Sequence, residues 1–119
     1  MDMHFDGVVF QSHAAEVARR IRYPWPPFAV LDVRPAAEFE RQRLPGARRF
    51  DPAGTDGLPE GTTAATELFV IGRDPDDAGV RQATERLRRA GAQRIVEVPG
   101  GLREWRQLGL PVESGQRAA

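Results

Sequence analysis

The residues best suited to binding or catalysis form one short run directly after the apolar segment Leu68–Ile71. The run reads Gly72, Arg73, Asp74, Pro75, Asp76, Asp77, Ala78 and Gly79. A loop leading from a buried strand into a helix points several backbone amides at one spot, and these amides together with the helix N-terminus favour an anion. Carboxylates at that spot repel an external anion. We call this group of amides the anion cradle. We hypothesise that the carboxylate of Asp74, Asp76 or Asp77 fills it, so that the chain supplies its own anion.

The same acids have two plainer interpretations. Asp74 to Asp77 reads as a helix start, with an Asp cap, a proline at the first helical position and acids in the first turn. Capping of this helix, with the acids otherwise exposed to solvent, would be enough to explain the three carboxylates. A metal or hydrolytic role would need oxygen ligands from other elements, and Asp32 is the nearby acid available. Because the chain has two histidines and no cysteine, we expect no metal centre and no cofactor.

The elements that must position this run alternate between short strands and helices, the pattern of a parallel sheet covered on both faces. Strands are expected over residues 7–10, 28–31, 47–50, 68–71 and 95–98. Helices are expected over 13–22, 35–41, from the Asp74–Asp77 start signal to Ala90, and over 102–108. Ser12 is expected to cap the first helix, and Gly91 to end the long one. The chain is therefore predicted to be one α/β domain over residues 7–113, with a parallel sheet of about five strands and short tails at 1–6 and 114–119.

Three further candidates are the pair Asp32 and Arg34, then Arg73, and then Trp25. Asp32 and Arg34 follow the uninterrupted apolar run Phe28–Leu31, at the end of a buried strand where open α/β sheets place ligand crevices. Arg73 also lies just past a strand end, and it is the best candidate for contacting a ligand. Trp25, flanked by prolines, is expected to fold back over the edge of the sheet. The alternative is a recognition element, since Pro-rich segments with an aromatic residue can bind partners.

Composition restricts the class of protein. The 17 basic and 17 acidic side chains cancel, which argues against nucleic acid as a partner. No apolar run approaches the roughly 20 residues that span a bilayer, and the acidic N-terminus does not look like a signal peptide. We therefore expect no membrane partner and a cytoplasmic location. Every basic side chain is Arg, a composition typical of a GC-rich bacterial genome.

Two motifs give the chain a family resemblance. The first is Asp32-Val33-Arg34 with Glu38-Phe39, continuing to Leu44-Pro45-Gly46-Ala47. The second runs from Val98-Pro99-Gly100-Gly101 to Trp105, followed by Gly109-Leu110-Pro111-Val112. Their order and spacing resemble a single rhodanese (sulfurtransferase) domain over nearly the whole chain. The resemblance implies that Asp32 and Arg34 brace the active-site loop. Gln42-Arg43 departs from the pattern, because the family commonly has Gly-His there.

The main departure concerns the nucleophile. Active members of the family carry a catalytic cysteine directly after the strand that resembles Leu68–Ile71. Counting from the strand places Gly72 at the cysteine position, whereas counting back from the following helix places Asp74 there. The loop is thus about two residues longer than in active members, and neither residue can form a persulfide. The resemblance identifies 72–79 as a vestigial active-site loop with no catalytic residue.

The functional expectation follows from this departure. We expect a catalytically inactive rhodanese-like domain that serves as a binding or regulatory module with a protein partner, and self-association into a homodimer is a further expectation. One alternative is a sulfurtransferase-type component that handles thiosulfate or persulfide sulfur with a partner's cysteine. The other alternative is a small-anion sensor that keeps the cradle without the chemistry.

Overall fold

The computed structural model describes residues 8–55 and 57–115. The strands are β1 (Val8–Gln11), β2 (Phe28–Asp32), β3 (Arg48–Arg49), β4 (Glu67–Ile71) and β5 (Arg94–Val98). The helices are α1 (Ala14–Arg22), α2 (Ala36–Arg41), α3 (Ala78–Arg89) and α4 (Gly101–Gln107). No helix among the described residues is long and apolar enough to cross a membrane.

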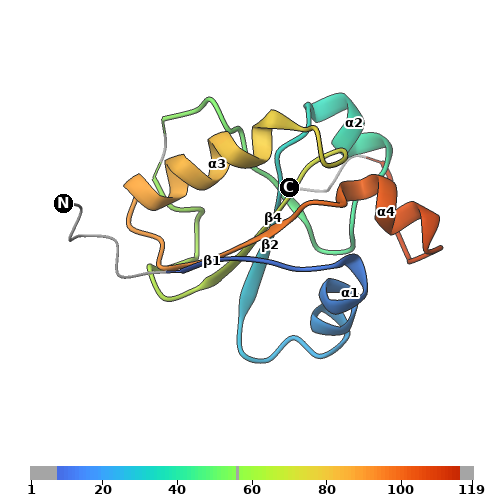
Figure 1. The fold of residues 1–119 in the computed structure, drawn as a ribbon, viewed down its shortest axis with the longest axis horizontal. Coiled ribbons are helices and arrows are strands. Elements are labelled where there is room, and N and C mark those ends of the chain that lie inside the picture. Colours follow the sequence, from blue (N-terminus) through green and yellow to red (C-terminus); the bar gives the residue numbers. More distant parts are fainter. Residues whose placement is uncertain (1–7, 56, 116–119) are drawn as a thin grey trace.

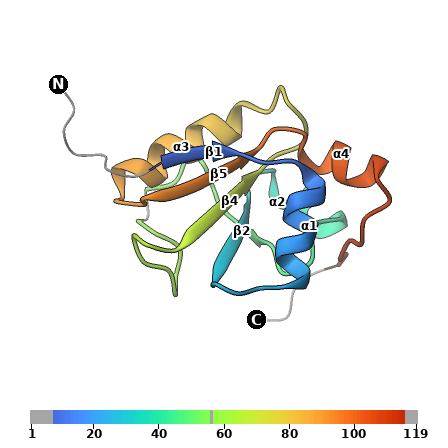
Figure 2. The ribbon, with the colours of Figure 1, turned by 60° about the horizontal axis from the view of Figure 1, so that its bottom comes forward.

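The strands form one sheet in the order β1-β5-β4-β2-β3, and all neighbouring pairs are parallel. Figures 1 and 2 show α3 on one face of this sheet and α1 on the other. The expected parallel α/β sheet of five strands with helices on both faces is confirmed. Because all strands run the same way, the loops that follow β2, β4 and β5 lie at one edge of the sheet.

The central strands alternate their side chains between two hydrophobic cores, one on each face. In β4, Phe69 and Ile71 pack with α1, α2 and α4, whereas Leu68 and Val70 pack against α3. Trp105 of α4, the tryptophan of the second motif, is buried at 1% exposure. Burial on both faces explains why β2 and β4 are nearly continuous apolar runs in the sequence.

Several predicted boundaries are wrong. The first helix is capped at His13 without a side-chain hydrogen bond, and the amide of Ala14 donates instead to Glu104 of α4. The strand expected over 47–50 shortens to Arg48–Arg49. The first strand runs over Val8–Gln11, and residue 7 of its expected range lies outside the described residues.

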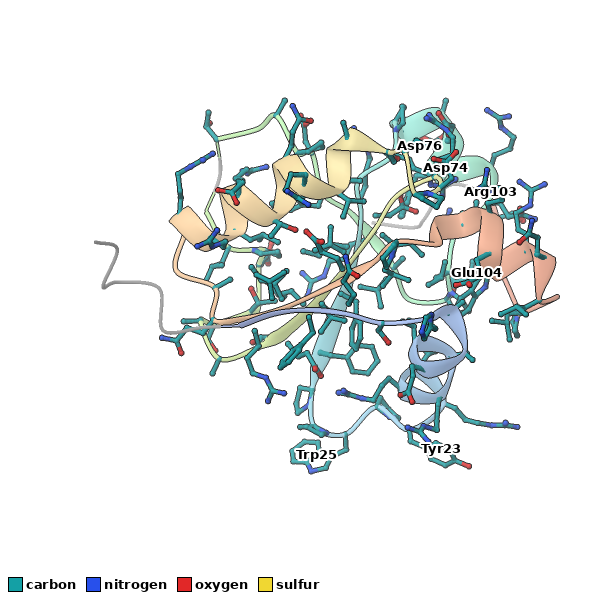
Figure 3. All side chains as sticks on the ribbon, viewed as in Figure 1. Tyr23, Trp25, Asp74, Asp76, Arg103 and Glu104 are labelled. Atoms are coloured by element: carbon teal, nitrogen blue, oxygen red, sulfur yellow. The ribbon has the colours of Figure 1, made fainter. Side chains whose placement is uncertain are left out.

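Trp25 does not fold over the sheet edge. Its side chain is 81% exposed and projects from the connection between α1 and β2 together with Tyr23 (Figure 3). The connection bends at Tyr23 and at Pro26, and the amide of Trp25 donates to the carbonyl of Tyr23 at 2.9 Å.

The start of α4 fixes the loop that follows β4. The amides of Leu102 and Arg103 donate to the carbonyls of Gly72 and Arg73, each at 3.0 Å. Gly101 has φ +62°, and a Cβ atom built on it would lie 2.6 Å from the carbonyl carbon of Arg73. Only a glycine permits both this backbone conformation and this approach.

We expect Gly101→Ala to lower the free energy of unfolding by about 3 kcal/mol, since it combines left-handed strain with a backbone clash. Gly109→Ala is the matched control, because Gly109 has φ +69° and nothing within 4 Å of the added Cβ. The control should lose only about 1 kcal/mol through backbone strain. Urea unfolding followed by circular dichroism measures both, and equal losses would show that the close approach to the loop is unimportant.

Candidate functional site

The candidate site is the loop from Gly72 to Gly79, at the carboxyl end of β4. In Figure 3, Asp74 and Asp76 lie on the connection between β4 and α3, with Arg103 of α4 nearby. The loop thus lies at the edge of the sheet where the neighbouring strands β2, β4 and β5 end. This is the edge at which parallel α/β sheets place their ligand sites.

Asp77 is the central residue of the loop. Its Oδ2 atom accepts a hydrogen bond from the amide of Arg73 at 2.8 Å, and its Oδ1 atom accepts one from the amide of Gly79 at 2.9 Å. Asp77 is therefore the N-cap of α3, which begins at Ala78. The prediction that Asp74 caps this helix is wrong. The amide of Asp77 instead donates to the carbonyl of Asp74 at 3.1 Å, so a turn precedes the helix.

The side chain of Asp77 also occupies the space in front of Gly72. A Cβ atom built on Gly72 would lie 2.6 Å from Oδ2, 2.8 Å from Cγ and 2.9 Å from Cβ of Asp77. These distances are shorter than the normal non-bonded contacts of a Cβ atom. A side chain at position 72 would therefore have to displace the carboxylate.

The other two acids of the loop have smaller roles. Asp74 accepts the amide of Asp76 through its Oδ1 atom at 2.9 Å. The Asp76 side chain is exposed and accepts no hydrogen bond from the described residues. Among the described residues, no group of three or more His, Cys, Asp or Glu side chains is arranged to hold a metal ion. Two of the three loop carboxylates, those of Asp74 and Asp77, thus accept amides of the loop itself.

Arg73 is paired with a side chain of α2. Its Nε and Nη2 atoms donate to the two carboxylate oxygens of Glu38, at 3.0 and 2.5 Å. The hydrogen bonds from Arg73 lower the pKa of Glu38; the charges of Arg73, Arg34 and Arg41 also lower it, while burial opposes them. The same pairing raises the pKa of Arg73. Arg73 therefore serves first to join the loop to α2.

Asp32 and Arg34 form a buried ion pair beside the loop. Arg34 Nη2 lies 2.8 Å from Asp32 Oδ2, and the two side chains are 4% and 1% exposed. Arg34 also donates to the carbonyl of Gln42 at 2.5 Å, and its own carbonyl accepts from Arg49. The contacts of this pair therefore hold the C-terminal cap of α2 and the last residue of β3. That they brace the 72–79 loop stays a prediction.

An open pocket of about 650 Å³ adjoins the outer side of the loop. Arg73 and Asp74 line it on one side, and Arg103 and Arg106 of α4 line it on the other. Sequence reasoning missed the two arginines of α4. Their spacing of three residues on a predicted helix was the available signal, because it places both on one face opposite the buried Trp105.

Comparison with known proteins agrees with this geometry. The model of the rhodanese-like domain family matches residues 13–108. One curated relative, the adenylyltransferase and sulfurtransferase UBA4 of Lodderomyces elongisporus, is 34% identical over 86 residues, which cover 64% of this chain and 18% of that protein. The chain thus spans less than a fifth of the length of that relative.

Solved structures show the same fold. The rhodanese-like domain of an Anabaena sp. protein has a TM-score of 0.75 and 28% identity, covering 87% of this chain and 78% of that one. A full-length protein from Lactobacillus plantarum has a TM-score of 0.75 at 23% identity, covering 88% of each chain.

The family match spans most of the chain and agrees with the strand order and the motifs around Asp32 and Gly101. The chain belongs to the rhodanese-like domain family, and it is a member without a cysteine.

Proposed function

We propose that this domain is a catalytically inactive rhodanese-like module that works by binding a protein partner. One observation carries the proposal. The carboxylate of Asp77 lies where a side chain at position 72 would begin, and both of its oxygens accept loop amides. The chain supplies from its own sequence the anion that the loop and the helix start favour.

The chemistry supports the same conclusion. Sulfur transfer through a protein persulfide needs a thiolate nucleophile, and the 119 residues contain no cysteine. A carboxylate cannot accept sulfane sulfur in its place. The loop would also have to move before any nucleophile at position 72 could fit, since the added Cβ would collide with Asp77. The missing thiol and the filled space are independent obstacles to catalysis.

The two alternatives differ in their support. A small-anion sensor needs free amides, and the amides of Arg73, Asp76, Asp77 and Gly79 already donate within the loop. A sulfur-handling component is the second candidate, because the similarity to UBA4 is to a protein named as a sulfurtransferase. That role would require a cysteine from outside these 119 residues.

We place the module in the cytoplasm with a protein as its partner, a second copy of the chain included, rather than a membrane or a nucleic acid. The balanced charge of the chain supports the exclusion of nucleic acid, since binding to phosphates needs a basic excess. The choice of partner then depends on the surface beside the loop.

We expect Gly72→Cys to remain inactive in a thiosulfate-to-cyanide sulfur transfer assay. Its rate should not exceed that of free cysteine at the same concentration, because Asp77 obstructs the new side chain and occupies the amides. Gly72→Ser is the matched control for packing, and its thermal stability should fall as much as that of the cysteine variant. Turnover by Gly72→Cys well above free cysteine would contradict the proposal that the loop is closed.

We expect Asp77→Ala to lower the free energy of unfolding by about 1–2 kcal/mol, since it removes the cap of α3 and leaves the amides of Arg73 and Gly79 without their acceptor. Asp76→Ala removes the same charge from an exposed side chain one residue away, and it should change stability by less than about 0.5 kcal/mol. Denaturant unfolding of both variants tests the difference. Equal effects would mean that Asp77 contributes only its charge.

A further inference from the structure

We infer that the groove between α2 and α4 binds an acidic segment of a partner protein through Arg41, Arg103 and Arg106. The inference rests on the binding role proposed above and identifies the surface and the chemistry of the partner. It concerns the outer side of the 72–79 loop, not the cradle that Asp77 fills.

The groove is made of two adjoining pockets. The first, of about 650 Å³, includes Arg103 and Arg106 in its lining. The second, of about 320 Å³, includes Arg41 and again Arg106. Both pockets are also lined by Arg34, Glu38 and Leu102, so they form one continuous depression between the two helices.

The charges in this groove are not balanced. Arg34 forms an ion pair with Asp32, and Arg73 forms one with Glu38. By contrast, the guanidinium groups of Arg41, Arg103 and Arg106 have no ion pair or hydrogen bond with any of the residues 8–55 and 57–115, and all three residues are exposed. Arg103 and Arg106 face the same side of α4, three residues apart, where like charges repel. An external anion would relieve this repulsion.

The neighbouring Glu38 is affected by one of these three arginines, Arg41. The charges of Arg34 and Arg41 add to the hydrogen bonds from Arg73 in lowering the pKa of this carboxyl group. Arginines of this surface thus stabilise a carboxylate that the chain itself provides. Carboxylates from a partner would meet Arg41 of this set, together with Arg103 and Arg106 of α4.

The arrangement favours an acidic peptide over other anions. A single small anion needs several donors converging in a water-excluded site, whereas these arginines are exposed and distributed over two helices. Nucleic acid needs a basic excess over a wide surface, but Asp74 and Glu38 line the same groove and the whole chain is neutral. A flexible segment with several carboxylates can pair with the arginines and avoid the acids. Arg is also suited to planar carboxylates, which it binds through two hydrogen bonds.

The test is fluorescence polarisation of the full chain with a labelled peptide of alternating Glu and Ser, at low salt and again at raised salt. The same peptide with Gln in place of Glu is the control probe. We expect the Glu peptide alone to bind, and R103S/R106S to weaken it about tenfold, since each exposed pair contributes little by itself. R22S/R89S is the matched control variant, because it removes the same charge from exposed positions on α1 and α3, and it should weaken binding less than about twofold.

Three outcomes would overturn the inference: no binding of the Glu peptide at low salt, an equal loss in both double variants, or tighter binding of a single-stranded oligonucleotide than of the peptide. The sulfur transfer assay keeps this result separate from the proposed absence of catalysis. Turnover by the unmodified chain would remove the proposed function and leave a measured peptide site intact. If the peptide does not bind and the chain shows no turnover, only the proposal that this groove binds an acidic segment is rejected.

Discussion

Both oxygens of the Asp77 carboxylate accept backbone amides of the connection between β4 and α3, and the rest of the loop depends on this interaction. The amide of Arg73 lies at the start of the connection, and the amide of Gly79 lies in the first turn of the helix. One side chain therefore closes the loop and caps the helix. Because an unpaired amide at a partly buried position costs free energy, the carboxylate removes the need for an external anion.

The remaining contacts of the loop follow from this closed form. The start of α4 donates two amides to the carbonyls of Gly72 and Arg73, and the backbone of Gly101 packs directly on the loop. The Arg73 side chain reaches outward to Glu38 on α2. The loop is thus held between three helices, and the surface left for a partner is its outer side. This placement explains why the proposed binding surface lies in the groove of α2 and α4 rather than in the former cradle.

The sequence predicts the fold well where the physical cause is local or repetitive. The apolar runs Phe28–Leu31 and Leu68–Ile71 indicate strands buried on both faces, and both belong to central strands of the observed sheet. The motifs around Asp32 and Gly101 indicate the family to which the chain belongs. Function is not predicted in the same way, since the absence of cysteine excludes an activity without showing what replaces it.

The errors lie where a distant partner decides the local structure. Asp74-Pro75 matches the local rule for a helix start, but Asp77 is the observed cap. Its Oδ2 atom also accepts a hydrogen bond from the amide of Arg73, a contact that the local rule does not include. The α1 helix shows the same effect. Ser12 matches the local rule for a cap, yet Glu104 satisfies the first amide from a position 90 residues away. The groove arginines come from α2 and α4, so only the folded chain shows that they face one depression.

The central claim is that Asp77 fills an anion cradle that would otherwise bind an oxyanion. The most direct measurement is the thermal stability of the unmodified chain, Asp77→Ala and Asp76→Ala in sulfate, compared with chloride at equal ionic strength. Sulfate stabilises folded proteins in general, so the difference between variants is the informative quantity. The account predicts that sulfate raises the melting temperature of Asp77→Ala more than that of the other two proteins. An equal rise in all three would show that no cradle lies beneath the carboxylate, and it would contradict the account.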